Sequence, residues 1–506
     1  MRVNSLLLLV AGTSLVQAYP VRRALTRPET KLAAGKRENR VQSLLQWAEE
    51  VQIACSKTLQ LTAEASSGLG WFSKGSKLPN NQVLIQVPTD QALSIESPGD
   101  GPNDRRVLEA VPDTKAFREL PWFVQMSVYL NRLKELGDKK VWLESLPTQL
   151  DTPIHWTSGM DDLQYPYLQD SVARQSQRWK GYYDKLGISS LSYDDFVWGC
   201  EMARSRAFSG AYTGSAFNPL IYAFTLFLVT IYVGLNLGTL EQAANGAGVV
   251  VSVSILKDFV VPKLFKTKRY VICPMIDMTN HRSKPSAEVS FEYFANAYSL
   301  ATTEDIPAGE QVFISYGARS NDQLLQYYGF VEPDNPCDVY VMPPLREWDI
   351  GALEKATGRT FEAGRLEKLN RAGLLGSDVV DDDGDIANTG GGVVLTRVSG
   401  IDPAILQALR ALVSTKEEWE GAGEAVGNFV TENSAGVENE TAARTAARTA
   451  IEMELASKTT TLEQDLALLK KTGSMKSQSS EVEDKLALLF RIEKKKLLTE
   501  TINRLR

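Results

Sequence analysis

The sequence predicts an α+β fold, because strands and helices are expected in separate blocks along the chain. Short strand patterns occur at 82–88 and again between 270 and 330. Between them, residues 113–187 are helical and aromatic in pattern, whereas a doubly wound sheet would alternate strands and helices regularly. Past Arg346 the pattern is helical again.

Each element follows from its local pattern. Apolar residues at helical spacing predict a first amphipathic helix over 41–54, and a glycine-rich turn is expected at 67–72. The strand at 82–88 ends at a proline. Later strands are expected over 270–275, 287–294, 297–303 and 311–316. The final segment, 441–506, predicts two helices separated at 473–480.

Composition limits the chemistry that the chain can perform. The 506 residues contain four cysteines, widely spaced and never as CxxC, and two histidines. These counts argue against a disulfide scaffold, a zinc ribbon and a His-rich metal site, so no metal is expected. Residues 1–40 carry a net charge of +6, which leaves −13 on the rest of a chain whose total is −7. Such an acidic body disfavours nucleic acid as a partner.

The first 40 residues predict a targeting segment. Arg2, an apolar run over 6–16 and small residues up to Ala18 indicate a secretory signal peptide over residues 1–18. The basic stretch over residues 19–40 is typical of a transit peptide. Together they predict import into a plastid enclosed by extra membranes. Secretion with a basic pro-segment is the alternative.

Four short strings, far apart in sequence, point to one family. They are Gly68-Leu69-Gly70; Ser205-Arg206-Ala207-Phe208; a segment from Pro274 to Asn280-His281; and Gly309 to Gly317, which continues to Tyr328-Gly329-Phe330. This set resembles the SET-domain methyltransferases, specifically the branch of the Rubisco large-subunit lysine methyltransferase. The resemblance extends through the C-terminal helices, which are similar to that family's substrate-binding domain.

The resemblance implies a pseudoknotted SET-domain β-fold with a helical insertion, followed by an all-α substrate-binding domain. We expect the SET domain over residues 41–335 and the substrate-binding domain over residues 336–506. Relatives that act on histones often carry a cysteine-rich zinc cluster after the SET domain. Here only Cys337 follows, so that substrate class loses support.

The resemblance also implies the cofactor and the site. S-adenosyl-L-methionine would be surrounded by Gly68, Leu69, Gly70, Ser205, Arg206, Asp277, Asn280, His281 and Tyr316. Tyr316 would be the catalytic residue, orienting the accepting amine, and Phe208 and Tyr328 would line the substrate channel. The acceptor must be a neutral amine, although free lysine has a pKa of about 10.4. Burial and a nearby positive sulfonium both lower that pKa.

The leading hypothesis is therefore a protein-lysine N-methyltransferase that acts on a folded protein docked by the C-terminal helices. Histidine N-methylation is an alternative within the enzymes. A non-catalytic, membrane-associated binding module is an alternative from another class. The presence of Tyr316, Asn280 and His281 speaks against a decayed domain.

An apolar insert at 207–269 is the largest departure from the family. No charged residue occurs from 207 to 240, and residues 219–237 would be long enough to cross a bilayer. A shorter apolar run at 246–256 precedes five basic residues. Since the flanking strands must meet in one compartment, a single crossing is excluded. Membrane association through residues 214–262, as a hairpin or an interfacial loop, and a soluble helix pair covering the catalytic domain both remain open.

Residues 377–392 have a composition that is also found in calcium-binding loops. Residues 377–392 are rich in aspartate and glycine, but the spacing does not fit a calcium-binding EF-hand, since Val379 stands where an acid is required. A solvated acidic loop is expected there.

Overall fold

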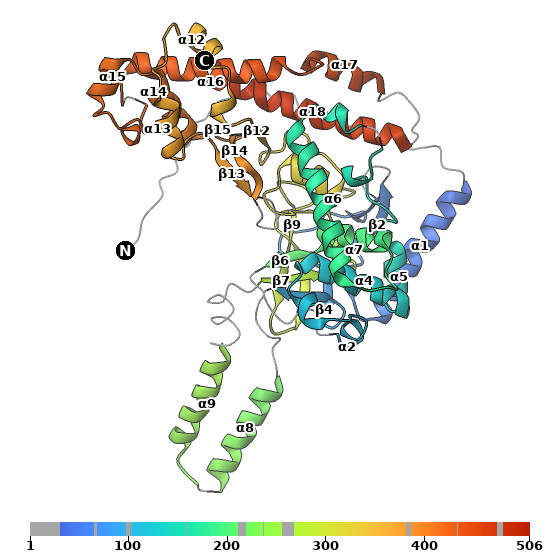
Figure 1. The fold of residues 1–506 in the computed structure, drawn as a ribbon. Helices are drawn as coiled ribbons and strands as arrows, with labels where there is room; N and C mark the ends of the chain where they lie inside the picture. Colours follow the sequence, from blue (N-terminus) through green and yellow to red (C-terminus); the bar gives the residue numbers. More distant parts are fainter. Residues whose placement is uncertain are drawn as a thin grey trace.

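The computed structural model describes residues 31–64, 68–97, 102, 104–157, 159–210, 219–235, 237–255, 268–380, 386–432, 434–472 and 479–506. The predicted signal peptide over 1–18 and the first part of the predicted transit segment, residues 19–30, lie outside this range. Residues 31–40 of that segment belong to a helix that continues to Glu50, so the first helix begins earlier than the predicted residue 41. The described chain forms two regions, each around its own hydrophobic core, and a helical hairpin that extends away from them (Figure 1).

Small β-sheets form the centre of the first region. The largest is antiparallel, with the strand order β1-β4-β10-β9. Strands β5, β7 and β6 form a second sheet, β2 pairs with β3, and β8 runs parallel to β11. The strands are β1 (Ala54–Cys55), β2 (Leu59–Glu64), β3 (Gly68–Ser73), β4 (Val83–Pro88), β5 (Leu93–Ser97), β6 (Phe208–Gly210), β7 (Lys268–Ile272), β8 (Asn280–His281), β9 (Ala287–Glu292), β10 (Ala297–Thr302) and β11 (Phe313–Ile314).

Helices pack around these sheets and share their core. Phe123, Trp142 and Phe196 are fully buried and join the helices to the strands. The helices are α1 (Lys31–Glu50), α2 (Arg105–Leu108), α3 (Thr114–Arg118), α4 (Trp122–Leu136), α5 (Lys140–Ser145), α6 (Pro166–Leu186), α7 (Tyr193–Arg206) and α11 (Asn321–Tyr328), with 3-10 turns η1 (Pro153–His155), η2 (Asp161–Leu163) and η4 (Ile276–Met278).

The second region is mainly helical and packs around its own core. Tyr165, Leu168 and Val172, at and after the start of α6, contribute to this core and so tie the two regions together. Its elements are β12 (Val339–Met342), η5 (Leu345–Glu347), α12 (Ile350–Thr357), α13 (Arg365–Arg371), β13 (Ser377–Val380), β14 (Ile386–Thr396), β15 (Gly400–Ile401), α14 (Pro403–Val413), α15 (Lys416–Gly421), η6 (Val426–Asn428), α16 (Val437–Ala456), α17 (Leu462–Thr472) and α18 (Ser479–Arg504).

The α+β class is confirmed. The expectation of two helices over 441–506 is wrong, because the described residues there form three: most of α16, then α17 and α18, with an unpredicted break between Ala456 and Leu462. The all-α expectation for the C-terminal region is incomplete, because β12, β14 and β13 form a sheet there, with β15 beside β14. The pairing of Val341 with Val394 joins residues more than fifty positions apart, which a local pattern cannot reveal. The predicted acidic loop over 377–392 is wrong for its two flanks, since 377–380 and 386–392 pair as β13 and β14; residues 381–385 lie outside the described residues.

Two local predictions also need correction. The first helix ends at Glu50 rather than at residue 54, because Gln52 has a positive φ of 62° and the chain turns into β1. The expected glycine-rich turn is instead the start of strand β3, where Gly68 pairs with Glu64 and Gly70 with Thr62.

The apolar insert forms α8 (Pro219–Gly234) and α9 (Leu240–Ile255). This pair does not cover the catalytic domain, as one alternative expected, but extends from it (Figure 1). The apolar helix stops at Gly234, short of the predicted residue 237. Within the described ranges, no helix has both the length and the apolar character needed to cross a membrane.

Candidate active site

Parallel pairing of β8 with β11 brings two of the sequence strings together. Asn280 lies opposite Phe313, and His281 lies opposite Ile314, so Tyr316 follows directly beyond the His281 position. The backbone N–H of Tyr316 donates to Nδ1 of His281 at 3.0 Å. The two rings lie 5.0 Å apart. Residues separated by 35 positions in sequence therefore form one rigid unit.

The hydroxyl of Tyr316 is directed to a backbone carbonyl. It donates to the carbonyl oxygen of Thr279 at 2.9 Å. Burial raises the pKa of Tyr316; Arg206 opposes this shift, while Tyr328 and Asp277 add to it. The tyrosine is thus a neutral hydroxyl at physiological pH, and its oxygen lies beside a second oxygen, that of Thr279.

Aromatic rings lie against Tyr316 and His281. Tyr328 stacks on Tyr316 with ring centroids 5.1 Å apart, and Phe330 lies 6.0 Å from His281. Gly329, between the two aromatic residues, has a φ of 75° and ends α11. A Cβ at this glycine would lie 3.0 Å from the backbone of Asp151. Only glycine satisfies both conditions, so it sets the direction of Tyr328 and Phe330.

The tautomer of His281 follows from its contacts. Because Nδ1 accepts the hydrogen of the Tyr316 N–H, the neutral ring carries its proton on Nε2. That nitrogen lies 3.4 Å from Oε2 of Glu332. Burial disfavours the ionised form of Glu332, but His281 and the hydroxyl and N–H of Ser283 outweigh it and lower the pKa of that carboxyl. Glu332 therefore lies at the Nε2 side of the His281 ring, while the Tyr316 N–H lies at the Nδ1 side.

Arg206 and Asp277 form a buried ion pair near the tyrosine. Nη1 of Arg206 donates to the carbonyl oxygen of Asp277 at 3.0 Å and to its Oδ2 at 3.1 Å. Trp142 Nε1 approaches the same carboxylate at 3.3 Å, and the Asp277 side chain is fully buried. Burial raises the pKa of Asp277, against the effect of Arg206 and Trp142. The carboxylate thus faces two protein donors, a geometry suited to positioning Arg206.

The other expected cofactor residues lie around β3. The amide nitrogen of Asn280 lies 3.5 Å from the carbonyl oxygen of Leu69. A Cβ at Gly70 would lie 2.9 Å from that nitrogen and would collide with Nε2 of Gln311. Glycine at position 70 thus lets two side-chain amides approach the backbone of β3. The Ser205 hydroxyl instead donates to the carbonyl oxygen of Glu201 within α7, at 2.7 Å.

These residues fit the cofactor that the resemblance implies. Several buried polar atoms of the site have no hydrogen-bond partner among the described residues; they include Nε2 of Gln311, Nε of Arg206, Oγ1 of Thr279 and Nε2 of His281. Buried polar groups are normally paired, so unpaired donors gathered around β3 and β8 are suited to a polar ligand. Among the described residues, no group of three or more His, Cys, Asp or Glu side chains could hold a metal ion.

Sequence reasoning placed Phe208 in the channel, and the structure packs its ring against Tyr298, 5.9 Å away. It missed Gln311, Phe330 and Glu332. The first two lie inside the strings that identified the site, so their position was a usable signal. Glu332 carries no signal, because its role depends on a contact with His281, 51 positions earlier.

Two family models match this chain. The family model described as "SET domain" matches residues 104–317, and that described as "Rubisco LSMT substrate-binding" matches residues 369–498. The "Ribulose-1,5 bisphosphate carboxylase/oxygenase large subunit N-methyltransferase, chloroplastic" of Pisum sativum is 22% identical over 60% of this chain and 53% of its own length. The "N-lysine methyltransferase SETD6" of Homo sapiens is 41% identical over 21% of this chain and 23% of its own length. The chain thus spans about half of the pea relative, and less of the human one.

A solved structure, the "Crystal structure of the SET domain of LSMT bound to Lysine and AdoHcy", shares the fold. It aligns with a TM-score of 0.56 at 20% identity and covers 92% of this chain and 91% of its own. The chain combines a SET domain with a Rubisco LSMT substrate-binding domain and is homologous to the Rubisco large-subunit N-methyltransferases.

Proposed function

We propose that the chain is an S-adenosyl-L-methionine-dependent protein-lysine N-methyltransferase. The observation that carries the proposal is the Tyr316 hydroxyl beside the Thr279 carbonyl oxygen, on a ring that lies against those of His281 and Tyr328. When bound, the cofactor supplies an electrophilic methyl group on a positively charged sulfur. The residues of this chain must then deliver a neutral amine to it.

The aromatic rings favour the neutral amine. A lysine ammonium that enters among Tyr316, Tyr328 and Phe330 loses water, and burial lowers the pKa of an amine. The neutral amine retains a lone pair that can be aligned with the methyl group, and such alignment supplies much of a rate enhancement. Because its pKa is raised, the Tyr316 hydroxyl contributes a fixed dipole rather than a charge. We assign Tyr316 the role of catalytic residue on this basis.

The cofactor is proposed to lie against Gly68, Leu69 and Gly70, within reach of Asn280, His281, Arg206 and Gln311. Gln311 is added to the set because its amide is buried, unpaired and directed at Gly70. Asp277 is proposed to act through Arg206, and Ser205 through its place at the end of α7. Phe208 and Tyr328 are proposed to line the substrate channel.

The Rubisco LSMT-type domain supports a protein as the substrate, and we propose that its helices α16, α17 and α18 dock that protein. A plastid location is proposed as well. It is supported by the predicted signal and transit segments and by the chloroplastic pea relative.

Tyr316→Phe tests the function directly. We expect a loss of about 100-fold or more in kcat for methyl transfer from labelled cofactor to plastid extract, because one oriented hydroxyl is removed from the site. Tyr183→Phe is the matched control, since the Tyr183 hydroxyl also donates to a backbone carbonyl at 2.9 Å, that of Leu191, but on α6. Equal activity in the two variants would contradict the role of Tyr316. Mass spectrometry of the labelled protein identifies the acceptor, and a methylated histidine would overturn the lysine assignment.

A further inference from the structure

The α8–α9 hairpin is attached to the SET domain at one place. Strands β6 and β7, which precede and follow it, pair with each other, with Phe208 opposite Val271 and Gly210 opposite Arg269. The two helices pack against one another and extend away from the body (Figure 1). Both ends of the insert are therefore attached to the SET domain side by side, at the paired strands β6 and β7.

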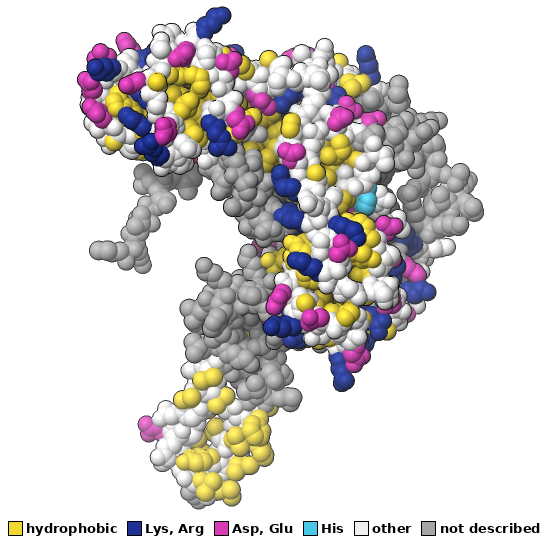
Figure 2. All heavy atoms as spheres, in the orientation of Figure 1, with side chains coloured by type: hydrophobic (Ala, Val, Ile, Leu, Met, Phe, Trp, Pro, Cys, Tyr) yellow, Lys and Arg dark blue, Asp and Glu magenta, His cyan; other side chains and the backbone are white. Residues whose placement is uncertain are grey.

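Apolar side chains cover the hairpin. Twelve of the large hydrophobic side chains that lie exposed in the described residues belong to it. Glu241 is the only charged residue in α8 and α9, and Figure 2 shows apolar side chains over much of the hairpin, with white polar and glycine residues between them. The twelve are Phe224, Leu226, Phe227, Leu228, Ile231, Leu235, Leu237, Leu240, Val249, Val250, Val251 and Val253.

The exposed side chains do not form a single stripe. Leu226, Phe227 and Leu228 are 67%, 57% and 48% exposed, and successive helical residues point about 100° apart. A protein partner or a second copy of the chain covers one face of a helix and leaves the opposite face in water. A helix that is apolar all round requires an apolar environment on every side.

The tip of the hairpin has the same character. Leu235, Leu237 and Leu240 flank the turn between the helices and are 66%, 63% and 66% exposed. The turn itself contains Gly234, Asn236 and Gly238, as turns usually do, and Glu241 follows Leu240. The exposed leucines beside these residues are the side chains of the tip that suit an apolar medium.

We propose that the α8–α9 hairpin inserts tip-first into a lipid bilayer and holds the SET domain at the membrane surface. The 16 residues of α8 extend about 24 Å, less than the hydrocarbon core of about 30 Å, so the hairpin enters and leaves by the same face. Both helices satisfy their own backbone hydrogen bonds, as a lipid environment requires. The sequence that follows α9 carries Lys257, Lys263, Lys266 and Lys268, which suits anionic headgroups.

Vesicle flotation of the full chain tests the proposal without any methyl transfer. Anionic vesicles contain phosphatidylcholine and phosphatidylglycerol, and neutral vesicles contain phosphatidylcholine alone. We expect the chain to float with the anionic vesicles and to remain bound at about 0.5 M salt, because insertion is apolar and salt screens only the charges. Absence of flotation, or its loss at high salt, would overturn insertion.

Two sets of substitutions locate the contact. The combined variant Phe224→Ser, Phe227→Ser, Leu235→Ser and Leu237→Ser is expected to lower the vesicle-bound fraction by about tenfold or more. The control, Phe294→Ser with Val398→Ser, removes two residues of 83% and 75% exposure outside the hairpin and should leave binding unchanged. Circular dichroism verifies that both variants fold.

A deletion that joins Gly210 to Lys268 by a short Gly-Ser linker should abolish flotation and retain methyl transfer. If the full chain instead forms a dimer in lipid-free buffer and this deletion makes it monomeric, the hairpin is a self-association surface and the proposal fails. Flotation is measured without cofactor or substrate. Its failure is therefore distinguishable from a failure of the proposed function.

Discussion

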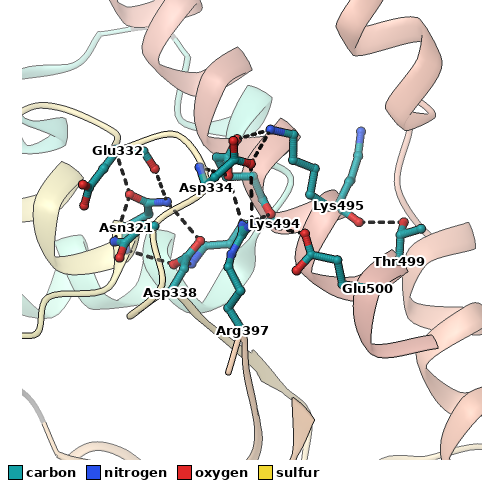
Figure 3. Close-up of polar contacts among 12 residues, drawn as sticks. Asn321, Glu332, Asp334, Asp338, Arg397, Lys494, Lys495, Thr499 and Glu500 are labelled. Carbon is teal, nitrogen blue, oxygen red and sulfur yellow. Dashed lines mark hydrogen bonds and ion pairs between the residues drawn. The ribbon is translucent and has the colours of Figure 1, made fainter. Parts of the chain in front are cut away.

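The C-terminal region and the α8–α9 hairpin join the SET domain in opposite ways. The first is joined by buried charges: Nζ of Lys494 on α18 donates to Asp322 Oδ2 and Asp338 Oδ1, both at 2.8 Å, and to the carbonyl oxygen of Val339. Figure 3 labels Lys494 and Asp338 in this group of polar contacts. The hairpin is joined through β6 and β7 and carries one charged residue.

The two attachments differ in how strictly they fix the position of the attached part on the SET domain. A buried ion without its partner is costly, so α18 can sit on α11 only where Lys494 meets both carboxylates. Since α11 ends at Tyr328, this contact also holds one wall of the proposed channel in place. The hairpin has no comparable constraint, and its exposed surface implies an environment outside the chain.

Lys494→Met should break the charged junction with the largest effect. Loss of the ammonium leaves Asp322 and Asp338 buried without their cation, and we expect a loss of about 3–5 kcal/mol in the free energy of unfolding in urea. Lys485→Met is the control on the same helix. Its side chain is exposed, so the loss should stay below about 0.5 kcal/mol. Similar losses in both variants would show that the junction does not depend on burial.

The two carboxylates at Lys494 should differ from one another. Asp338 accepts hydrogen bonds from the backbone and side-chain nitrogens of Asn321, at 2.9 and 3.0 Å, in addition to Lys494. Oδ1 of Asp322 has no partner among the described residues, and burial raises the pKa of this carboxyl, against the effect of Lys494. Asp338→Asn should therefore cost more than Asp322→Asn, by about 1 kcal/mol or more. Urea unfolding of the pair measures the difference, and the reverse order would contradict this account.

The sequence predicted the site better than it predicted either attachment. Asn280, His281 and Tyr316 stand in short strings whose order is informative without a structure, and the fold brings these residues together. Lys494 stands in a run of charged residues near the end of the chain, which alone indicates a solvated helix face. Its burial depends on Asp322 and Asp338, more than 150 positions away. The exposure of α8 was equally invisible, because an apolar run is compatible with a core, a membrane or a partner.

Acid should weaken the contacts that the Glu332 carboxylate makes with His281 and Ser283. The pKa of this carboxyl is lowered from its ordinary 4.5, because the nearby His281 ring and the hydrogen bonds from Ser283 outweigh burial. A lowered folded-state pKa means that the stabilisation is fully present above about pH 4.5 and is lost as the pH falls through the folded value. The urea concentration at the unfolding midpoint should therefore decrease as the pH is lowered below about 4.5. This decrease should be smaller in Glu332→Gln than in the native chain. An identical acid dependence in both would exclude Glu332 as a contributor.

The hairpin should show the smallest effect of all on folding. Phe224 and Phe227 are 60% and 57% exposed, so Phe224→Ser with Phe227→Ser removes little buried apolar surface. In lipid-free buffer we expect the free energy of unfolding to change by less than about 0.5 kcal/mol. Phe123→Ser, at a fully buried position on α4, should cost about 3 kcal/mol or more. A hairpin variant as costly as the Phe123 variant would mean that α8 packs on the body in solution. A neutral one would mean that these phenylalanines are retained for a contact that folding does not need, which is the contrast with Lys494.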